Sequence, residues 1–129
     1  MADFIRAAIT FVLSNFPLTF FVIGLIVSLI AIARSPAPRD AATIVEKLIS
    51  WHVFFALGAT YFYNFVFHVF FGKMAAAFIG WADSPFQFEV GMADFAIGVT
   101  ACLAFRASLG FKAAAVSGSW TMASTRART

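Results

Sequence analysis

Three long apolar runs, separated by short polar connections, constrain this chain more than any other feature. They cover residues 7–33, about 49–71 and 85–105. A helix of ~20 apolar residues crosses the hydrocarbon core of a bilayer, so each run is long enough to span. The composition agrees, because 62% of the residues are hydrophobic and 12% are charged, whereas soluble domains are roughly 45–50% apolar and 25% charged. These features exclude a disordered chain, a coiled coil and an ordinary soluble enzyme. They predict an all-α integral membrane bundle with three transmembrane helices.

The runs and their flanks also predict where the helices begin and end. We expect spans at about residues 9–33, 42–71 and 85–106 within a single domain of residues 1–124, followed by a polar basic tail at 125–129. The first run is longer than the ~7–15 apolar residues of a typical signal peptide, so we expect it to remain as a span. Pro17, near its start, would kink this helix or form its first turn.

The second helix is too long to lie entirely within a membrane. At ~1.5 Å per residue it exceeds about 45 Å, against ~30 Å of hydrocarbon. Its first turns, which carry Glu46 and Lys47, should therefore project into the headgroups or water. Asp40 precedes the helix and can cap its N-terminus. Trp51 and Trp81 lie near the two membrane ends of this helix, as interfacial anchors do.

The start of the third helix has a strong local signal, Ser84-Pro85-Phe86-Gln87. Serine at the N-cap, proline at the first helical position and glutamine three residues after the cap predict a capping box. Glu89 in the first turn adds negative charge at the positive end of the helix dipole.

The C-terminal segment and the loops predict the orientation. Residues 113–123 are apolar but too short and too polar for a confident fourth span, so we expect at most a short fourth apolar segment. The first loop is basic, and so is the region after residue 105. Three spans place both on one side of the membrane, and basic loops face the cytoplasm. The N-terminus is then outside and the C-terminus is cytoplasmic.

A narrow stripe of small and polar residues follows one face of the third helix. Its members are Gln87, Gly91, Asp94 and Gly98. At 100° per residue they fall within about 60° of arc. Small residues let helices approach closely, so packing against another helix is the favoured interpretation. An acidic residue at membrane depth is costly and often functional, which makes Asp94 the candidate for a functional role.

A second polar face lies on the second helix, where Thr60, Asn64 and His68 recur every four residues. Antiparallel packing can bring the two faces together through an Asn64–Asp94 or a His68–Gln87 hydrogen bond. The favoured interpretation is interhelical hydrogen bonding that fixes the packing. The alternative is a polar site for a proton, an ion or a small ligand.

The sequence lacks signatures of catalysis or of a cofactor. His52 and His68 are 16 residues apart, about 24 Å along one helix, and point in nearly opposite directions, so one chain cannot use both on one haem. The single Cys102 and two distant histidines form no zinc-ligand cluster. No nucleophile elbow, phosphate loop or metalloprotease motif occurs. We therefore expect that the protein is not an enzyme and binds no metal or cofactor. Its 18 phenylalanines favour contact with lipid or a hydrophobic pigment.

Several residues form a pattern that resembles a known family. The pattern combines Tyr63-Asn64-Phe65, His68, Gly80-Trp81, Ser84-Pro85-Phe86-Gln87 and Glu89-Val90-Gly91. It is similar to a bacterial family of small multi-span membrane proteins of unknown function, from Ser14 to about Val116. The resemblance implies motif positions, but no activity, for Asn64, His68, Trp81, Gln87 and Glu89. The chain departs from the family at Asp94, where an uncharged residue is expected, and in its Ser/Thr/Arg tail, where a fourth apolar helix is expected.

These observations favour a small membrane protein without catalysis, working as an accessory or structural subunit of a homo-oligomer or a larger membrane complex. Its partners would be the lipid bilayer and other membrane subunits or further copies of itself, with no nucleic acid. We expect it in the bacterial inner (cytoplasmic) membrane. The alternatives are a channel or transporter subunit with a polar intramembrane site around His68 and Asp94, and a membrane enzyme or redox subunit.

Overall fold

The computed structural model describes residues 1–126, and the side chains of residues 1–118. In chain order the helical segments are α1 (Ala2–Ser14), α2 (Phe16–Ala33), α3 (Ala41–His52), η1 (Val53–Ala59), α4 (Thr60–Phe70), α5 (Gly72–Ile79), α6 (Phe86–Ala104) and α7 (Leu109–Arg126). Within the described residues, three stretches are long and apolar enough to cross a membrane: Phe16–Ala33, Ala41–Phe70 and Phe86–Ala104. The prediction of a helical chain with three candidate spans is confirmed.

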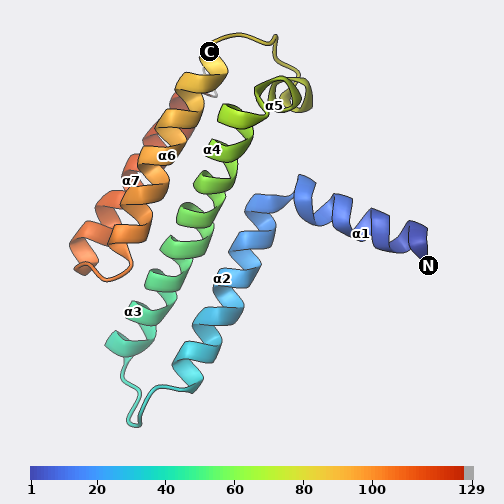
Figure 1. Cartoon of the computed structure of the whole chain (residues 1–129). Coiled ribbons are helices and arrows are strands. Elements are labelled where there is room, and N and C mark those ends of the chain that lie inside the picture. The colour runs from blue at the N-terminus through green and yellow to red at the C-terminus, as the bar shows by residue number, and fades with distance from the viewer. Residues whose placement is uncertain (127–129) are drawn as a thin grey trace.

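The long helix formed by α3, η1 and α4 is the centre of the bundle. α2 packs along α3 and η1 on one side, and α6 packs along η1 and α4 on the other (Figure 1). α2 is apolar around its whole circumference, and among its residues only Gly24 and Ser28 are buried. Such a helix suits contact with lipid over most of its surface.

The first apolar run is broken into two helices at Asn15. α1 and α2 leave this residue in different directions (Figure 1), so the predicted first span of residues 9–33 shortens to Phe16–Ala33. Pro17 explains the break, because it has no N–H to donate to the Leu13 carbonyl and its ring would clash with that carbonyl in a continuous helix. Pro17 lies instead in the first turn of α2, where an N–H is not needed.

The second predicted helix forms over Ala41–Phe70, but it is not α-helical throughout. Asp40 caps it as expected, because its carboxylate accepts a 2.8 Å hydrogen bond from the backbone N–H of Thr43. Hydrogen bonding to the side chain of Thr43, and then to its backbone N–H, lowers the pKa of Asp40 from its ordinary value of 3.8. In the middle, η1 is wound as a π-helix, and the Thr60 hydroxyl donates across five residues to the Phe55 carbonyl at 3.4 Å. Short π segments inside α-helices often mark functional positions.

The third helix begins where predicted, but without the predicted cap. Pro85 is the N-cap residue, and no side chain caps the first turn. The backbone N–H of Gln87 donates to the Ser84 carbonyl at 3.1 Å. The side chain of Gln87 is held by His68 instead, so it cannot reach back to Ser84. The capping box of Ser84, Pro85 and Gln87 is therefore not formed, because an interhelical partner takes the glutamine.

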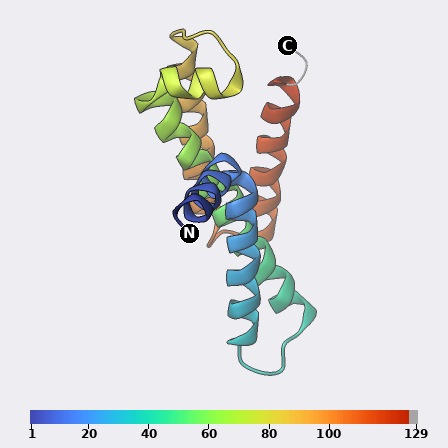
Figure 2. The ribbon, with the colours of Figure 1, turned by 90° about the vertical axis from the view of Figure 1, so that its right-hand side faces the viewer.

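The C-terminal segment forms one helix, α7, rather than a short apolar piece at 113–123. It turns back after α6 and packs on α6, η1 and α3. Its far end lies at the same end of the molecule as α5 (Figure 2). The first residues of the expected tail at 125–129 continue this helix, and residues 127–129 lie outside the described part. α7 is too polar to count among the candidate spans, because serine, glycine and threonine interrupt its apolar residues. One of its faces packs against the bundle.

α4 and α6 approach closely at two glycines of the predicted stripe. A Cβ on Gly91 would lie 2.6 Å from Cγ2 of Val69, and one on Gly98 would lie 3.1 Å from Cδ2 of Phe62. Neither position has room for a larger side chain unless its neighbour moves. The small members of the stripe thus lie at the α4–α6 contact, where they bring the polar residues of the two helices together.

Candidate functional site

His68 and Gln87 form a buried polar pair between α4 and α6. Their side chains are 9% and 4% exposed, and Nδ1 of His68 lies 2.6 Å from Oε1 of Gln87. An amide oxygen only accepts, so Nδ1 donates, and the other ring nitrogen of a neutral His68 is an acceptor. The side-chain nitrogen of Gln87 is buried without a hydrogen-bond partner in the described structure. This pair is one of the two hydrogen bonds that antiparallel packing predicts.

The other candidate residues lie at different distances from this pair. Asp94 is 0% exposed on α6, about two turns beyond Gln87. Asn64 lies one turn before His68 on α4 and lines the same cavity as His68. Glu89 is exposed in the first turn of α6. The structure therefore groups Asn64, His68 and Gln87, buries Asp94 deeper along α6, and leaves Glu89 outside the group.

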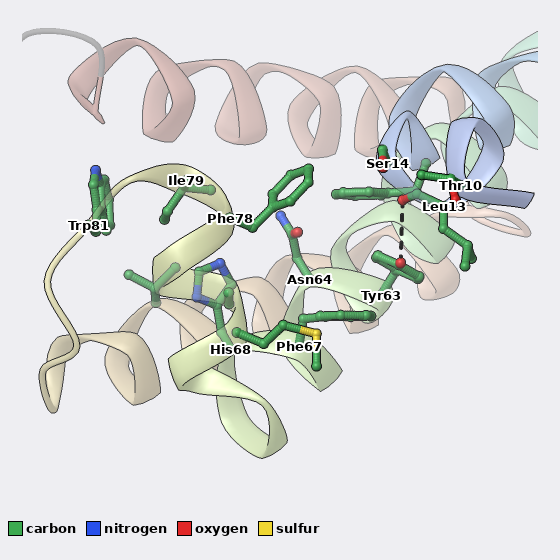
Figure 3. A pocket seen from close by; sticks show the side chains of 14 residues that line it. Thr10, Leu13, Ser14, Tyr63, Asn64, Phe67, His68, Phe78, Ile79 and Trp81 are labelled. Carbon is green, nitrogen blue, oxygen red and sulfur yellow. Dashed lines mark hydrogen bonds between the residues drawn. The ribbon is translucent and has the colours of Figure 1, made fainter. Parts of the chain in front are cut away.

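A cavity of about 590 Å³ opens beside His68. Small-molecule sites typically have volumes of ~300–1,000 Å³. Most of the wall is apolar and comes from α4, α5 and the start of α2, including Phe16, Phe67 and Phe78. Figure 3 shows the side chains of His68 and Asn64 projecting from α4 toward the space below Phe78 and Ile79. The cavity is therefore apolar with a polar group in one wall.

α1 forms one side of this cavity through Thr10, Leu13 and Ser14. The Tyr63 hydroxyl donates a long hydrogen bond, 3.4 Å, to the Leu13 carbonyl (Figure 3), which is the carbonyl that Pro17 leaves without its helical donor. None of the residues of α1 is buried. α1 thus borders the cavity only with its C-terminal turns, and its remaining residues extend away from the bundle (Figure 1).

The chemistry of these groups suits binding rather than metal chemistry. In the described part of the chain, no three residues among His, Cys, Asp and Glu gather where they could hold a metal ion. The cavity is lined by the imidazole of His68, the carboxamide of Asn64, the hydroxyl-bearing residues Thr10, Ser14 and Tyr63, and aromatic and aliphatic side chains. This arrangement can bind an apolar molecule that carries a small polar head group.

The two tryptophans predicted as interfacial anchors have different surroundings. Trp51 packs in an aromatic cluster with Phe54, Phe55 and Phe105, and its ring centroid lies 4.7 Å from that of Phe105. Trp81 is exposed and lines the edge of the cavity beside His68.

Sequence reasoning missed one residue, Lys112, which is buried and bonded to Ser50. The chain signal that could have identified it is a lone lysine followed directly by Ala113-Ala114-Ala115-Val116. From the sequence, Lys112 is only one member of the basic region after residue 105.

The fold and the site define a small helical protein with candidate membrane spans and an amphipathic cavity between its helices. Residues 14–127 match the family described as "Family of unknown function (DUF6790)". The match covers most of the chain, and the chain belongs to that family. No curated protein and no solved structure matches the chain.

Proposed function

We propose that this protein is a non-catalytic helical membrane protein that holds an apolar molecule with a polar head group in the cavity beside His68, between α4, α5 and the C-terminal turns of α1. It would do so as an accessory subunit of a homo-oligomer or of a larger membrane complex. The observation that carries the proposal is His68, which is hydrogen-bonded to the buried Gln87 and lines a largely apolar cavity of about 590 Å³. A polar group in such a wall fixes the orientation of a ligand, while the apolar surface supplies most of the affinity.

The hydrogen bond of the pair indicates the kind of head group. When Nδ1 of a neutral His68 donates to Gln87, the other ring nitrogen accepts from a ligand donor, and a hydroxyl is such a donor. The carboxamide of Asn64 can both donate and accept. The best match is therefore an apolar molecule that carries a hydroxyl group, with its body against Phe67 and Phe78.

Two substitutions on one helix test whether the cavity is occupied. Ala75 is buried and lines the cavity, whereas Ala77 on the same helix is exposed. Ala75→Phe should fill the cavity, and Ala77→Phe is the matched control. After gentle purification from native membranes, mass spectrometry of the organic extract should find a small molecule retained by the wild type and the control but lost from Ala75→Phe. Equal retention by both variants, or an empty wild type, would reject the proposal.

The accessory role has its own test, which is native mass spectrometry after mild extraction. Stoichiometric recovery with other membrane subunits, or as a defined homo-oligomer, is the expected result. Recovery as a lone monomer counts against the accessory role but leaves the cavity proposal intact.

A channel or transporter subunit with a polar site around His68 and Asp94 is the alternative. The close approach of Gly91 to Val69 argues against a water-filled path between α4 and α6 within one chain. Flux through liposomes that does not change after Asp94→Asn and His68→Ala would reject this alternative.

We also propose that the protein lies in the bacterial inner membrane, with the basic α2–α3 connection in the cytoplasm and the N-terminus outside. Three spans alone would leave the C-terminus in the cytoplasm. The return of α7 along α6 favours the outer side instead, because it directs the chain toward the end where α5 lies. In a Cys102→Ala background, a cysteine introduced at Thr129 should react with an impermeant reagent added outside intact cells. Labelling only after the membrane is opened would support the cytoplasmic position.

A further inference from the structure

Lys112 is a buried lysine at the other end of the bundle, in the first turn of α7. Its side chain is 2% exposed. Its ammonium group donates a 2.7 Å hydrogen bond to the Ser50 hydroxyl of α3. A lysine side chain normally extends until its charge reaches water. Here the charge is turned inward, between α7 and α3.

The partner of this ammonium is neutral. Within the described residues, Lys112 forms no salt bridge, and the acidic residues nearest in sequence to Ser50, Asp40 and Glu46, are exposed. An ammonium group has three donors, of which the Ser50 hydroxyl takes one. Burying a charge is costly unless an opposite charge and hydrogen bonds compensate it. The geometry therefore calls for an anion that is not part of the described chain.

Lys112 also lines a second cavity. It has a volume of about 520 Å³ and is walled by α2, α3, η1 and α7. Its wall is mostly apolar, with Phe21, Leu25, Ile49 and Val116 among the lining residues. The polar lining residues are Ser28, His52, Ser117 and Lys112, of which Lys112 carries the charge. An anion that fits here must bring an apolar part with it, since the remaining wall offers little to a hydrated ion.

The position of the cavity fits an anionic lipid. The α6–α7 turn lies toward the same end of the bundle as the α2–α3 connection (Figure 1). Arg34, Arg39, Lys47 and Arg106 also belong to this end. Basic pockets between membrane helices attract the head groups of anionic lipids, and juxtamembrane basic residues strengthen that attraction.

We propose that this cavity binds an anionic phospholipid, with the lipid phosphate against Nζ of Lys112 and an acyl chain along the apolar wall between α2 and α7. The phosphate supplies the missing opposite charge. The acyl chain covers apolar side chains of α2 that no other helix in the described part of the protein buries. This inference concerns a different cavity from the one beside His68, and it does not depend on the proposed function.

The test uses the full-length chain, purified in a mild detergent and stripped of lipid. Native mass spectrometry then measures binding of phosphatidylglycerol and of phosphatidylcholine with the same acyl chains. Inorganic phosphate is the third probe, because it offers the phosphate chemistry without the acyl chain. The proposal predicts binding of phosphatidylglycerol well above that of the other two.

The variant Lys112→Met removes the charge and keeps the length of the side chain. It should weaken phosphatidylglycerol binding roughly 10- to 100-fold, the effect of losing a charge-assisted hydrogen bond. Lys73→Met changes the net charge equally at an exposed position on α5 and should bind like the wild type. Lys112→Arg keeps the charge and should retain most of the binding.

Several results would overturn the proposal. One is equal binding of both lipids by the wild type, and another is a Lys112→Met variant that binds as the wild type does. Binding of inorganic phosphate as tight as that of the lipid would show an anion site without a lipid. If Lys112→Met does not fold, the melting temperature of the wild type tests the proposal instead. Phosphatidylglycerol should raise that temperature, and phosphatidylcholine should not.

Discussion

Replacing Gly91 by alanine tests the close contact that brings the polar residues of α4 and α6 together. The new Cβ would lie 2.6 Å from Cγ2 of Val69 and 3.2 Å from Cβ of His68. Carbon atoms pack best at ~3.5–4.0 Å, so the two helices must separate by roughly 1 Å or Val69 must turn. Overpacking of this kind costs about 1–3 kcal/mol. Alanine recovers ~0.8–1.0 kcal/mol through its better helix propensity. We therefore expect a net loss of about 1 kcal/mol in the free energy of unfolding.

Unfolding in mixed micelles, titrated with sodium dodecyl sulfate and followed by tryptophan fluorescence, measures this change. Gly118→Ala is the control, because a Cβ there meets nothing within 4 Å, and it should leave the stability unchanged or raise it by up to ~1 kcal/mol. The double variant Val69→Ala/Gly91→Ala removes the clashing methyl group. It should be more stable than the sum of the single changes predicts, by ~0.5 kcal/mol or more. Strict additivity, or a Gly91→Ala variant as stable as Gly118→Ala, would refute the reasoning.

Two further predictions concern the ends of the helices. Asp40→Ala should speed hydrogen exchange in the first turn of α3 at pH 7, because it removes the acceptor for the Thr43 N–H; Glu46→Ala, farther along the helix, is the control. The pKa of Asp40 is lowered below 3.8 in the folded chain, so its contribution is present above that pH and lost as the pH falls through the folded value. Protection of Thr43 that does not change at low pH would contradict this. Pro17→Ala restores an N–H for the Leu13 carbonyl, so α1 and α2 should merge. Spin labels at Ile5 and Leu25 should then move apart toward ~30 Å, the length of 20 helical residues, and an unchanged distance would show that Asn15 or Tyr63 sets the break.

The gross architecture was predictable from the sequence, because it depends on short-range properties. Apolar runs of sufficient length define the three candidate spans, and Asp40 caps the second helix through a hydrogen bond three residues away. The His68–Gln87 contact could also be predicted from the sequence, since helical spacing puts each residue on a defined helix face and the antiparallel order of the two helices puts both residues at the same end of the bundle. Pro17 marked a disturbance of the first run, although the choice between a kink and a first turn needed the structure.

Other features depend on which helix faces meet, and no local window of sequence contains that information. The side chain of Gln87 could bond either to Ser84 at the start of its own helix or to His68 on α4, and in the structure it bonds to His68. The burial of Lys112 against Ser50 joins residues 62 positions apart, and α7 forms despite a composition too polar for a predicted span. Both cavities arise only where three or more elements leave space between them. Sequence alone thus determined that the chain is helical and where it can cross a membrane. Tertiary packing decided which polar groups are buried together, because burial and pairing are properties of surfaces in contact.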